Sequence, residues 1–177
     1  MEWRLEGYAM AVVTDQTRNA IWQDLWDAER YVRYYGSLAD SYRVRHRNMR
    51  FALLAAIIIE ATVFLPNIPE PVFTFLTVVG GIVIAGLASW DAISDYARNS
   101  AMLAVASEDC GLVNTQWGEL WLDIESYAID ESQARARRRE LLDRLNAIAS
   151  RVDVGLDEKL NESCGEDAAK TLVEKYA

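Results

Sequence analysis

Residues 72–90 read VFTFLTVVGGIVIAGLASW and contain no charged side chain. A helix of this stretch, at about 1.5 Å per residue, is roughly 28 Å long, close to the ~30 Å hydrocarbon core of a bilayer. A hairpin buried in a soluble protein would need a polar face on such a helix, and this stretch has none. We therefore expect a membrane-spanning helix at about 71–90.

A second apolar stretch, residues 51–65, reads FALLAAIIIEATVFL and is interrupted only by Glu60 and Thr62. The three prolines of the chain, Pro66, Pro69 and Pro71, lie between the two stretches. Proline ends one helix and is tolerated in the first turn of the next, so little room remains for a connection. The sequence predicts a hairpin of two antiparallel spans, at about 50–66 and 71–90. The first span is short and needs its flanks or local bilayer thinning to cross.

The basic residues near the spans predict their orientation. Four arginines precede the first span, Arg98 follows the second, and the proline-rich turn contains no Lys or Arg. The positive-inside rule then places both termini in the cytoplasm. The residues expected at the membrane interface are Arg43, Arg45, Arg47, Arg50 and Trp90.

The segments on either side of the hairpin have helical periodicity. Residues 14–48 and 91–129 each carry apolar side chains at three- and four-residue steps, and a third helix is expected at about 132–152. Because the spans are antiparallel, the two long helices should pack side by side. We expect an all-α membrane protein with an N-terminal segment and amphipathic helix (1–48), a transmembrane hairpin (49–90), cytoplasmic helices (91–154) and a polar C-terminal tail (155–177) with one short helix near 167–176.

Aromatic residues recur on the two long helices. Trp22 and Trp26 are four residues apart on the first, and Trp117 and Trp121 are four residues apart on the second. At helical spacing such residues are more often core or subunit contacts than parts of a ligand cage. We predict that these four tryptophans form the bundle core or an oligomer contact.

Arginines are concentrated near the start of the third expected helix. Such a cluster either contacts anionic lipid headgroups or forms a solvated face that pairs with the acids of the chain. The sequence favours the solvated face, because this helix is separated from the expected spans by a long segment. The arginines are Arg135, Arg137, Arg138 and Arg139.

Glu60 is the most informative single residue. An ionised carboxylate near the bilayer centre costs about 2.5–3.5 kcal/mol, so such a residue usually faces a bundle interior or a wet cavity. Small residues recur at four-residue steps on both spans and allow close helix approach. The predicted pore-lining or span-packing residues are Glu60, Ala52, Ala56, Thr77, Gly81, Ala85 and Ser89.

Two interpretations of these faces remain open. They line a pore in an oligomer, or they pack the hairpin against itself with Glu60 protonated or hydrogen-bonded to Thr77 or a neighbour. Glu70, in the turn, forms an acidic ring at a pore mouth or is an ordinary solvated acid.

Composition and spacing exclude several classes of protein. The net charge is −9, with 18 Lys and Arg against 27 Asp and Glu, which argues against a nucleic-acid partner. The two cysteines, Cys110 and Cys164, and the single histidine, His46, have no zinc-site spacing. There is no glycine-rich phosphate loop and no nucleophile elbow. We predict no metal, no cofactor and no catalytic residue, and nothing in the sequence indicates an enzyme.

The order of elements resembles the SLATT family, two-span membrane proteins associated with bacterial conflict systems. The resemblance is carried by residues 21–90, especially Ala28-Glu29-Arg30-Tyr31 through Tyr42-Arg43 and then the two spans. It rests on layout and residue character rather than on a sharp motif, and it continues less specifically to about Val152. The tail beyond Gly155 has no counterpart in it.

The resemblance implies a function in the bacterial inner membrane. Such a protein is expected to be an antiphage effector that forms homo-oligomers and permeabilises or depolarises that membrane when a separate sensor protein activates it. The sequence leaves two alternatives open. One is a constitutive cation channel subunit with acidic rings from Glu60 or Glu70, and the other is a non-conducting membrane scaffold that binds a cytoplasmic partner.

Overall fold

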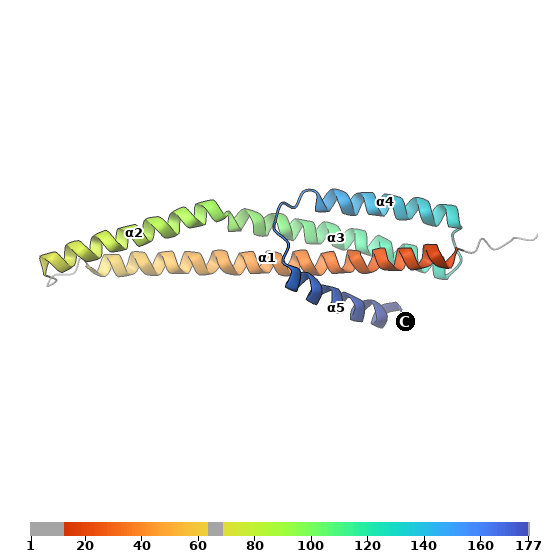
Figure 1. Cartoon of the computed structure of the whole chain (residues 1–177), viewed down its shortest axis with the longest axis horizontal. Helices are drawn as coiled ribbons and strands as arrows, with labels where there is room; N and C mark the ends of the chain where they lie inside the picture. Colours follow the sequence, from red (N-terminus) through yellow and green to blue (C-terminus); the bar gives the residue numbers. More distant parts are fainter. Residues whose placement is uncertain (1–12, 64–68, 177) are drawn as a thin grey trace, which may run out of the picture. The chain divides into compact units, whose positions relative to one another are not determined.

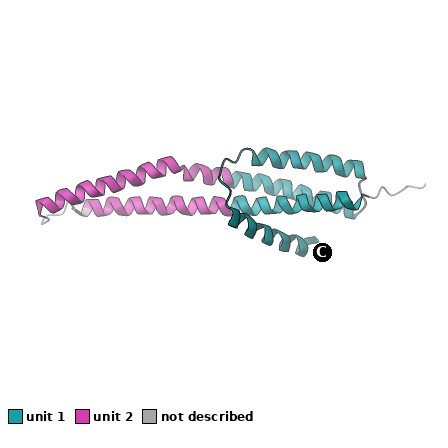
Figure 2. Ribbon diagram, viewed as in Figure 1, with its two compact units in different colours: residues 1–36, 104–177 teal, residues 37–103 magenta. Residues whose placement is uncertain are grey.

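The computed structural model describes residues 13–63 and 69–176. Over these residues the chain is all-helical and has no strand, which confirms the all-α part of the predicted fold class. The helices follow one another in the order α1 (Asp15–Val63), α2 (Glu70–Ser94), α3 (Tyr96–Glu125), α4 (Glu131–Ala149) and α5 (Glu158–Tyr176), as Figure 1 shows. They divide into two compact units (Figure 2). Unit 1 contains the described residues up to Gly36 and those from Ala104 onward, and unit 2 contains Ser37–Leu103.

Helix α1 joins the amphipathic segment and the first apolar stretch in one uninterrupted helix of 49 residues. Within its bounds there is no proline and one glycine, Gly36, so no residue favours a break. Gly36 lies against α3, because a Cβ placed on it would be 3.2 Å from the Ser107 hydroxyl oxygen. The glycine therefore permits a close approach of the two helices at a point where alanine would be tight.

The boundary between the second expected span and the helix that follows it lies at Asp95. This residue has φ 46° and ψ 35°, the left-handed conformation that ends many helices, and it separates α2 from α3. Aspartate tolerates that conformation better than most residues because its short side chain can bond locally. The boundary expected after Trp90 therefore lies five residues later. At its other end α2 begins with proline in the first turn, as predicted.

Unit 2 is a pair of antiparallel helical segments. Two contacts join these segments. The His46 Nδ1 and Asp91 Oδ1 atoms are 3.3 Å apart, and the rings of Tyr42 and Tyr96 have centroids 5.7 Å apart. Most apolar side chains of the pair point outward, and α2 has no buried residue. The largest exposed fractions include Phe51 (63%), Ile59 (65%), Phe75 (66%) and Ile82 (68%).

The run Glu70–Glu125, which contains α2 and α3, holds one segment long and apolar enough to cross a membrane. An 18-residue window in it has mean hydropathy 2.2, and none of that window is buried. A membrane-spanning segment of 18 residues is expected to contain at most two charged side chains. Over its described residues α1 holds no such segment, because the 18 residues that end at Val63 include Arg47, Arg50 and Glu60. The second expected span is thus supported, whereas the first is not confirmed. The expected end of the first span, at residues 64–66, lies outside the described residues.

Unit 1 is a helical bundle in which α3, α4 and α5 surround the first part of α1. Helices α1 and α3 pack side by side as predicted: the Ser107 hydroxyl donates to the Val32 carbonyl (2.9 Å), and the Asn114 amide donates to Glu29 (2.6 Å). Helix α4 begins with a capping box, in which the Asp130 carboxylate accepts from the Gln133 N–H at 2.8 Å. The core residues of this bundle include Ile21, Leu25, Ala28, Leu120, Ile124, Leu141, Leu145 and Ile148.

The segment expected to be a polar tail is a helix of the bundle. Helix α5 begins at Glu158, nine residues before the short helix that was expected, and is 19 residues long. It buries Cys164, Ala168 and Leu172. It contacts α1 where the Trp26 indole N–H donates to the Gly165 carbonyl at 3.1 Å. The small size of most of these buried side chains explains why the acidic segment gave little sign of a packed face.

Candidate functional site

Glu60 packs against Gly80 across the two helices of unit 2. A Cβ placed on Gly80 would overlap the Glu60 carboxylate, with Cδ only 2.6 Å away. The glycine therefore leaves the space that the carboxylate occupies. A hydrogen bond from Thr77 to Glu60, one of the alternatives that the sequence left open, does not form, since the buried Thr77 hydroxyl has no hydrogen-bond partner among the described residues. Sequence analysis identified Glu60 but missed Gly80.

The contact between the two helices follows a heptad pattern. On α1 the half-buried positions between 43 and 61 recur at alternating steps of three and four residues, and α2 repeats the pattern with steps of four and three. This spacing of 3.5 residues is typical of left-handed coiled coils and of most membrane bundles. The half-buried residues are His46, Met49, Leu53, Ala56 and Glu60 on α1, and Phe73, Thr77, Gly80, Ile84, Leu87, Asp91 and Ser94 on α2.

The predicted ladder of small residues therefore only partly coincides with this contact. Ala56, Glu60 and Thr77 belong to it, while Ala52, Gly81, Ala85 and Ser89 are exposed. Nothing lies within 4 Å of a Cβ placed on Gly81. A ladder with strict four-residue steps drifts away from a heptad contact, because the two periods differ. Gly81, Ala85 and Ser89 consequently form an exposed face of α2 that lies outside the contact with α1.

The other predicted residues of unit 2 lie on its surface. Trp90 is 56% exposed, and Glu70 is exposed at the first turn of α2. The four arginines that precede the apolar stretch of α1 are exposed as well, and the Arg45 guanidinium lies 5.9 Å from the centroid of the Tyr42 ring. These positions are compatible with a membrane interface, where charged and indole groups reach polar surroundings.

The four tryptophans of the bundle occupy three different environments. Trp117 is fully buried in the core. Trp22 and Trp121 face each other with centroids 4.8 Å apart, and Tyr176 of α5 lies edge-on to Trp22 at 6.2 Å. Trp26 contacts α5 through its hydrogen bond to the Gly165 carbonyl, and the Arg30 guanidinium lies 4.8 Å from the centroid of its ring. They are bundle contacts, as predicted, but not one cluster.

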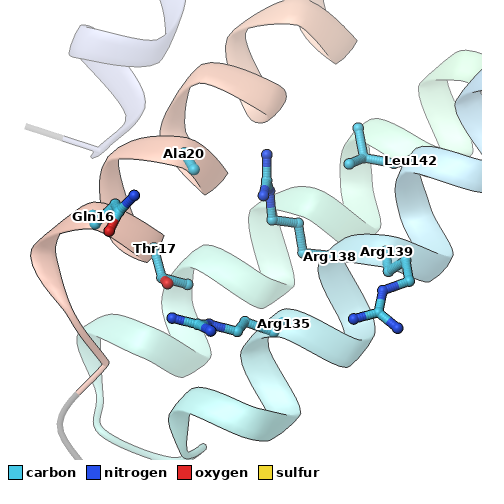
Figure 3. A pocket seen from close by; sticks show the side chains of 7 residues that line it. All are labelled: Gln16, Thr17, Ala20, Arg135, Arg138, Arg139 and Leu142. Carbon is cyan, nitrogen blue, oxygen red and sulfur yellow. The ribbon is translucent and has the colours of Figure 1, made fainter.

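A cavity of about 470 Å³ lies in unit 1 between the start of α1 and helix α4 (Figure 3). Helix α1 lines it with Gln16, Thr17 and Ala20. Helix α4 lines it with Leu142 and with the side chains of Arg135, Arg138 and Arg139, whose guanidinium groups point in different directions (Figure 3). The arginine cluster noted in the sequence is thus divided, since Arg137 faces α3 and pairs with Asp123 at 2.5 Å.

Two carboxylates hold arginines of this cavity. Glu131 accepts from the Thr17 hydroxyl (2.6 Å), the Thr14 N–H (2.8 Å) and the Arg135 Nε (2.6 Å). These hydrogen bonds, that from the Thr17 hydroxyl first, lower the pKa of Glu131 to about 2. Asp24 accepts from the Arg138 Nε at 2.5 Å.

The described residues contain no group of three or more His, Cys, Asp and Glu side chains that could hold a metal ion. Both cysteines are buried, and burial raises the pKa of the Cys110 thiol to about 11. Comparison with protein-family models, with curated proteins and with solved structures finds no match to this chain.

Proposed function

We propose that the chain is a membrane effector that assembles into homo-oligomers and permeabilises the bacterial inner membrane when a separate sensor activates it. In this proposal α2 and the apolar part of α1 both cross the bilayer. It also places both termini in the cytoplasm, because exposed arginines precede the apolar stretch of α1 and the proline-rich turn has no Lys or Arg. The resemblance to SLATT proteins in residues 21–90 supports the same topology and the same setting in antiphage defence.

The unused small face of α2 carries the proposal. Gly81, Ala85 and Ser89 are exposed although small residues at four-residue steps are typical of close helix contacts in membranes. The hairpin packs through a different row, so this face is available to a second copy. Two helices cannot enclose a channel, and a pore therefore requires several copies.

Glu60 gives the assembly a polar group at the depth of the spans. Its carboxylate lies at the contact of α1 and α2 rather than on the outermost surface. A small rotation of one helix about the other would turn this acid toward a lumen or away from it. Two arrangements that differ by a few kcal/mol would suffice for such a switch, and the bundle of unit 1 would bias them when the sensor binds.

The decisive experiment measures membrane potential in cells that express the chain, with and without phage infection. Gly81→Leu should abolish depolarisation because it blocks the small face, and Glu60→Ala should change it because it removes the acid. The matched control is Gly86→Leu, since Gly86 is also exposed on α2 with nothing within 4 Å of a placed Cβ. This control should behave as the wild type.

The outcomes separate the three functions. Depolarisation that requires infection and is lost in Gly81→Leu supports the regulated effector. Depolarisation without infection supports a constitutive channel. An unchanged potential with the wild-type chain in every condition contradicts both and leaves a membrane scaffold.

A further inference from the structure

We propose that the cavity between α1 and α4 is a binding site for a phosphate group, carried by a small soluble molecule or by a lipid headgroup. Three arginine side chains line one cavity of about 470 Å³, a size within the range of small-ligand sites. The proposal concerns unit 1 alone and does not depend on whether the hairpin conducts ions.

The arginines of this cavity retain most of their donors. Arg135 and Arg138 each use their Nε in the bonds to Glu131 and Asp24, and within the described residues their terminal amino groups have no protein acceptor. A guanidinium group has five N–H donors in a planar fork, so four remain on each side chain. The two carboxylates thus orient two guanidinium groups and leave the N–H donors of their terminal amino groups available.

Arg139 has no carboxylate partner among the described residues. Of the three arginines that line the cavity, two therefore pair with a carboxylate, and one positive charge has no acidic partner among the described residues. This unpaired positive charge occurs in a chain whose net charge is −9. Two of the cavity's uncharged side chains, Gln16 and Thr17, add polar groups at its α1 side.

Phosphate is the anion that best fits these donors. Arginine binds phosphate through two parallel N–H···O bonds, and three arginines around one space can serve several phosphate oxygens. Leu142 and Ala20 supply apolar atoms for the remainder of a ligand. A ligand held between α1 and α4 would stabilise their contact, because it would bind the folded bundle and not the unfolded chain.

The test uses the full chain, purified in a non-ionic detergent and titrated with pyrophosphate by calorimetry. We expect saturable binding that weakens about tenfold in Arg139→Gln, the effect of losing one charge-assisted contact. The control is Arg151→Gln, which removes the same charge from a 72%-exposed side chain of unit 1 outside the cavity. It should leave the affinity within about twofold.

A second pair of variants keeps every arginine in place. Gln16→Glu adds a carboxylate of nearly the same shape at the cavity and should weaken pyrophosphate binding about tenfold or more through repulsion. Gln116→Glu is the matched control, because Gln116 lies outside this cavity and accepts from Arg144 at 3.0 Å. Thermal unfolding in the absence of ligand checks that all four variants fold.

Repeating the titration in nanodiscs identifies the source of the phosphate. If pyrophosphate binds at least about tenfold more weakly in discs with phosphatidylglycerol than in pure phosphatidylcholine discs, and Arg139→Gln removes that difference, a lipid headgroup occupies the cavity. Equal affinity in both discs identifies a soluble phosphate compound. Absence of saturable binding up to about 10 mM, or equal weakening by Arg139→Gln and Arg151→Gln, overturns the proposal.

Discussion

Replacement of Gly80 by alanine tests the central contact of unit 2. The added Cβ would occupy the space of the Glu60 carboxylate, whose Cδ lies 2.6 Å from the ideal Cβ position. The helices need not separate, because the displaced atoms are the end of a flexible side chain. Turning a side chain away from its preferred rotamer costs about 0.5–1.5 kcal/mol, and we expect Gly80→Ala to lower the free energy of unfolding by that amount relative to Gly81→Ala, which shares its gain in helix propensity.

A double-mutant cycle separates the displacement of the Glu60 carboxylate from the effect that alanine at position 80 has on the helix itself. In Glu60→Ala the carboxylate is absent, so Gly80→Ala should then cost nothing, and the coupling energy should be about 0.5–1.5 kcal/mol. Gly81→Ala is the matched control, because nothing lies within 4 Å of its placed Cβ. It should be neutral or slightly stabilising and additive with Glu60→Ala.

The assay is unfolding of the purified chain in mixtures of SDS and mild detergent, followed by circular dichroism. Membrane potential in cells provides a second measurement, in which Gly80→Ala should resemble Glu60→Ala because both move the acid from the contact. Equal stability of Gly80→Ala and Gly81→Ala, with both additive to Glu60→Ala, would refute the contact between Glu60 and Gly80.

Two further predictions concern the bundle of unit 1. The pKa of Glu131 is lowered to about 2 in the folded chain, so its contribution to stability is complete above its unfolded pKa of about 4.3 and is lost as the pH falls from there through about 2. Acid titrations of unfolding should therefore show a difference between wild type and Glu131→Gln that shrinks over this range, and a constant difference would contradict it. With a pKa of about 11 the Cys110 thiol is only about one-thousandth thiolate at pH 8, so iodoacetamide should label it only after unfolding. Mass spectrometry of the labelled peptides tests this, with exposed Thr115→Cys on the same helix as a positive control, and rapid native labelling of Cys110 would disprove its burial.

The pairing of α1 with α3 could be predicted because large apolar residues mark the buried faces. Ile21 and Leu25 on α1, and Leu120 and Ile124 on α3, repeat at helical steps and are all buried. Such a signal survives in the sequence because only one face of each helix is apolar. The apolar helix at residues 72–90 could be predicted equally well, since a run of 19 residues without a charge is typical of a membrane-spanning helix.

Helix α5 and the break at Asp95 could not be predicted in the same way. The face of α5 that packs on α1 includes Cys164, Gly165 and Ala168, and small residues carry little hydrophobic signal in an acidic segment. The break at Asp95 depends on one residue that adopts a left-handed conformation. Sequence favours glycine or asparagine for that role, so an aspartate within a helical pattern gives no warning.

The exposure of Gly81, Ala85 and Ser89 on α2 has a physical cause that bears on assembly. Small residues at four-residue steps favour right-handed crossings, whereas the hairpin packs through a heptad row that favours left-handed ones. One helix can satisfy both patterns only if each faces a different neighbour. On α2 the heptad row with Gly80 faces α1, and the row with Gly81 is exposed. Under the proposed assembly, adjacent glycines therefore serve two different contacts: Gly80 admits the acid within one chain, and Gly81 is available to the next copy.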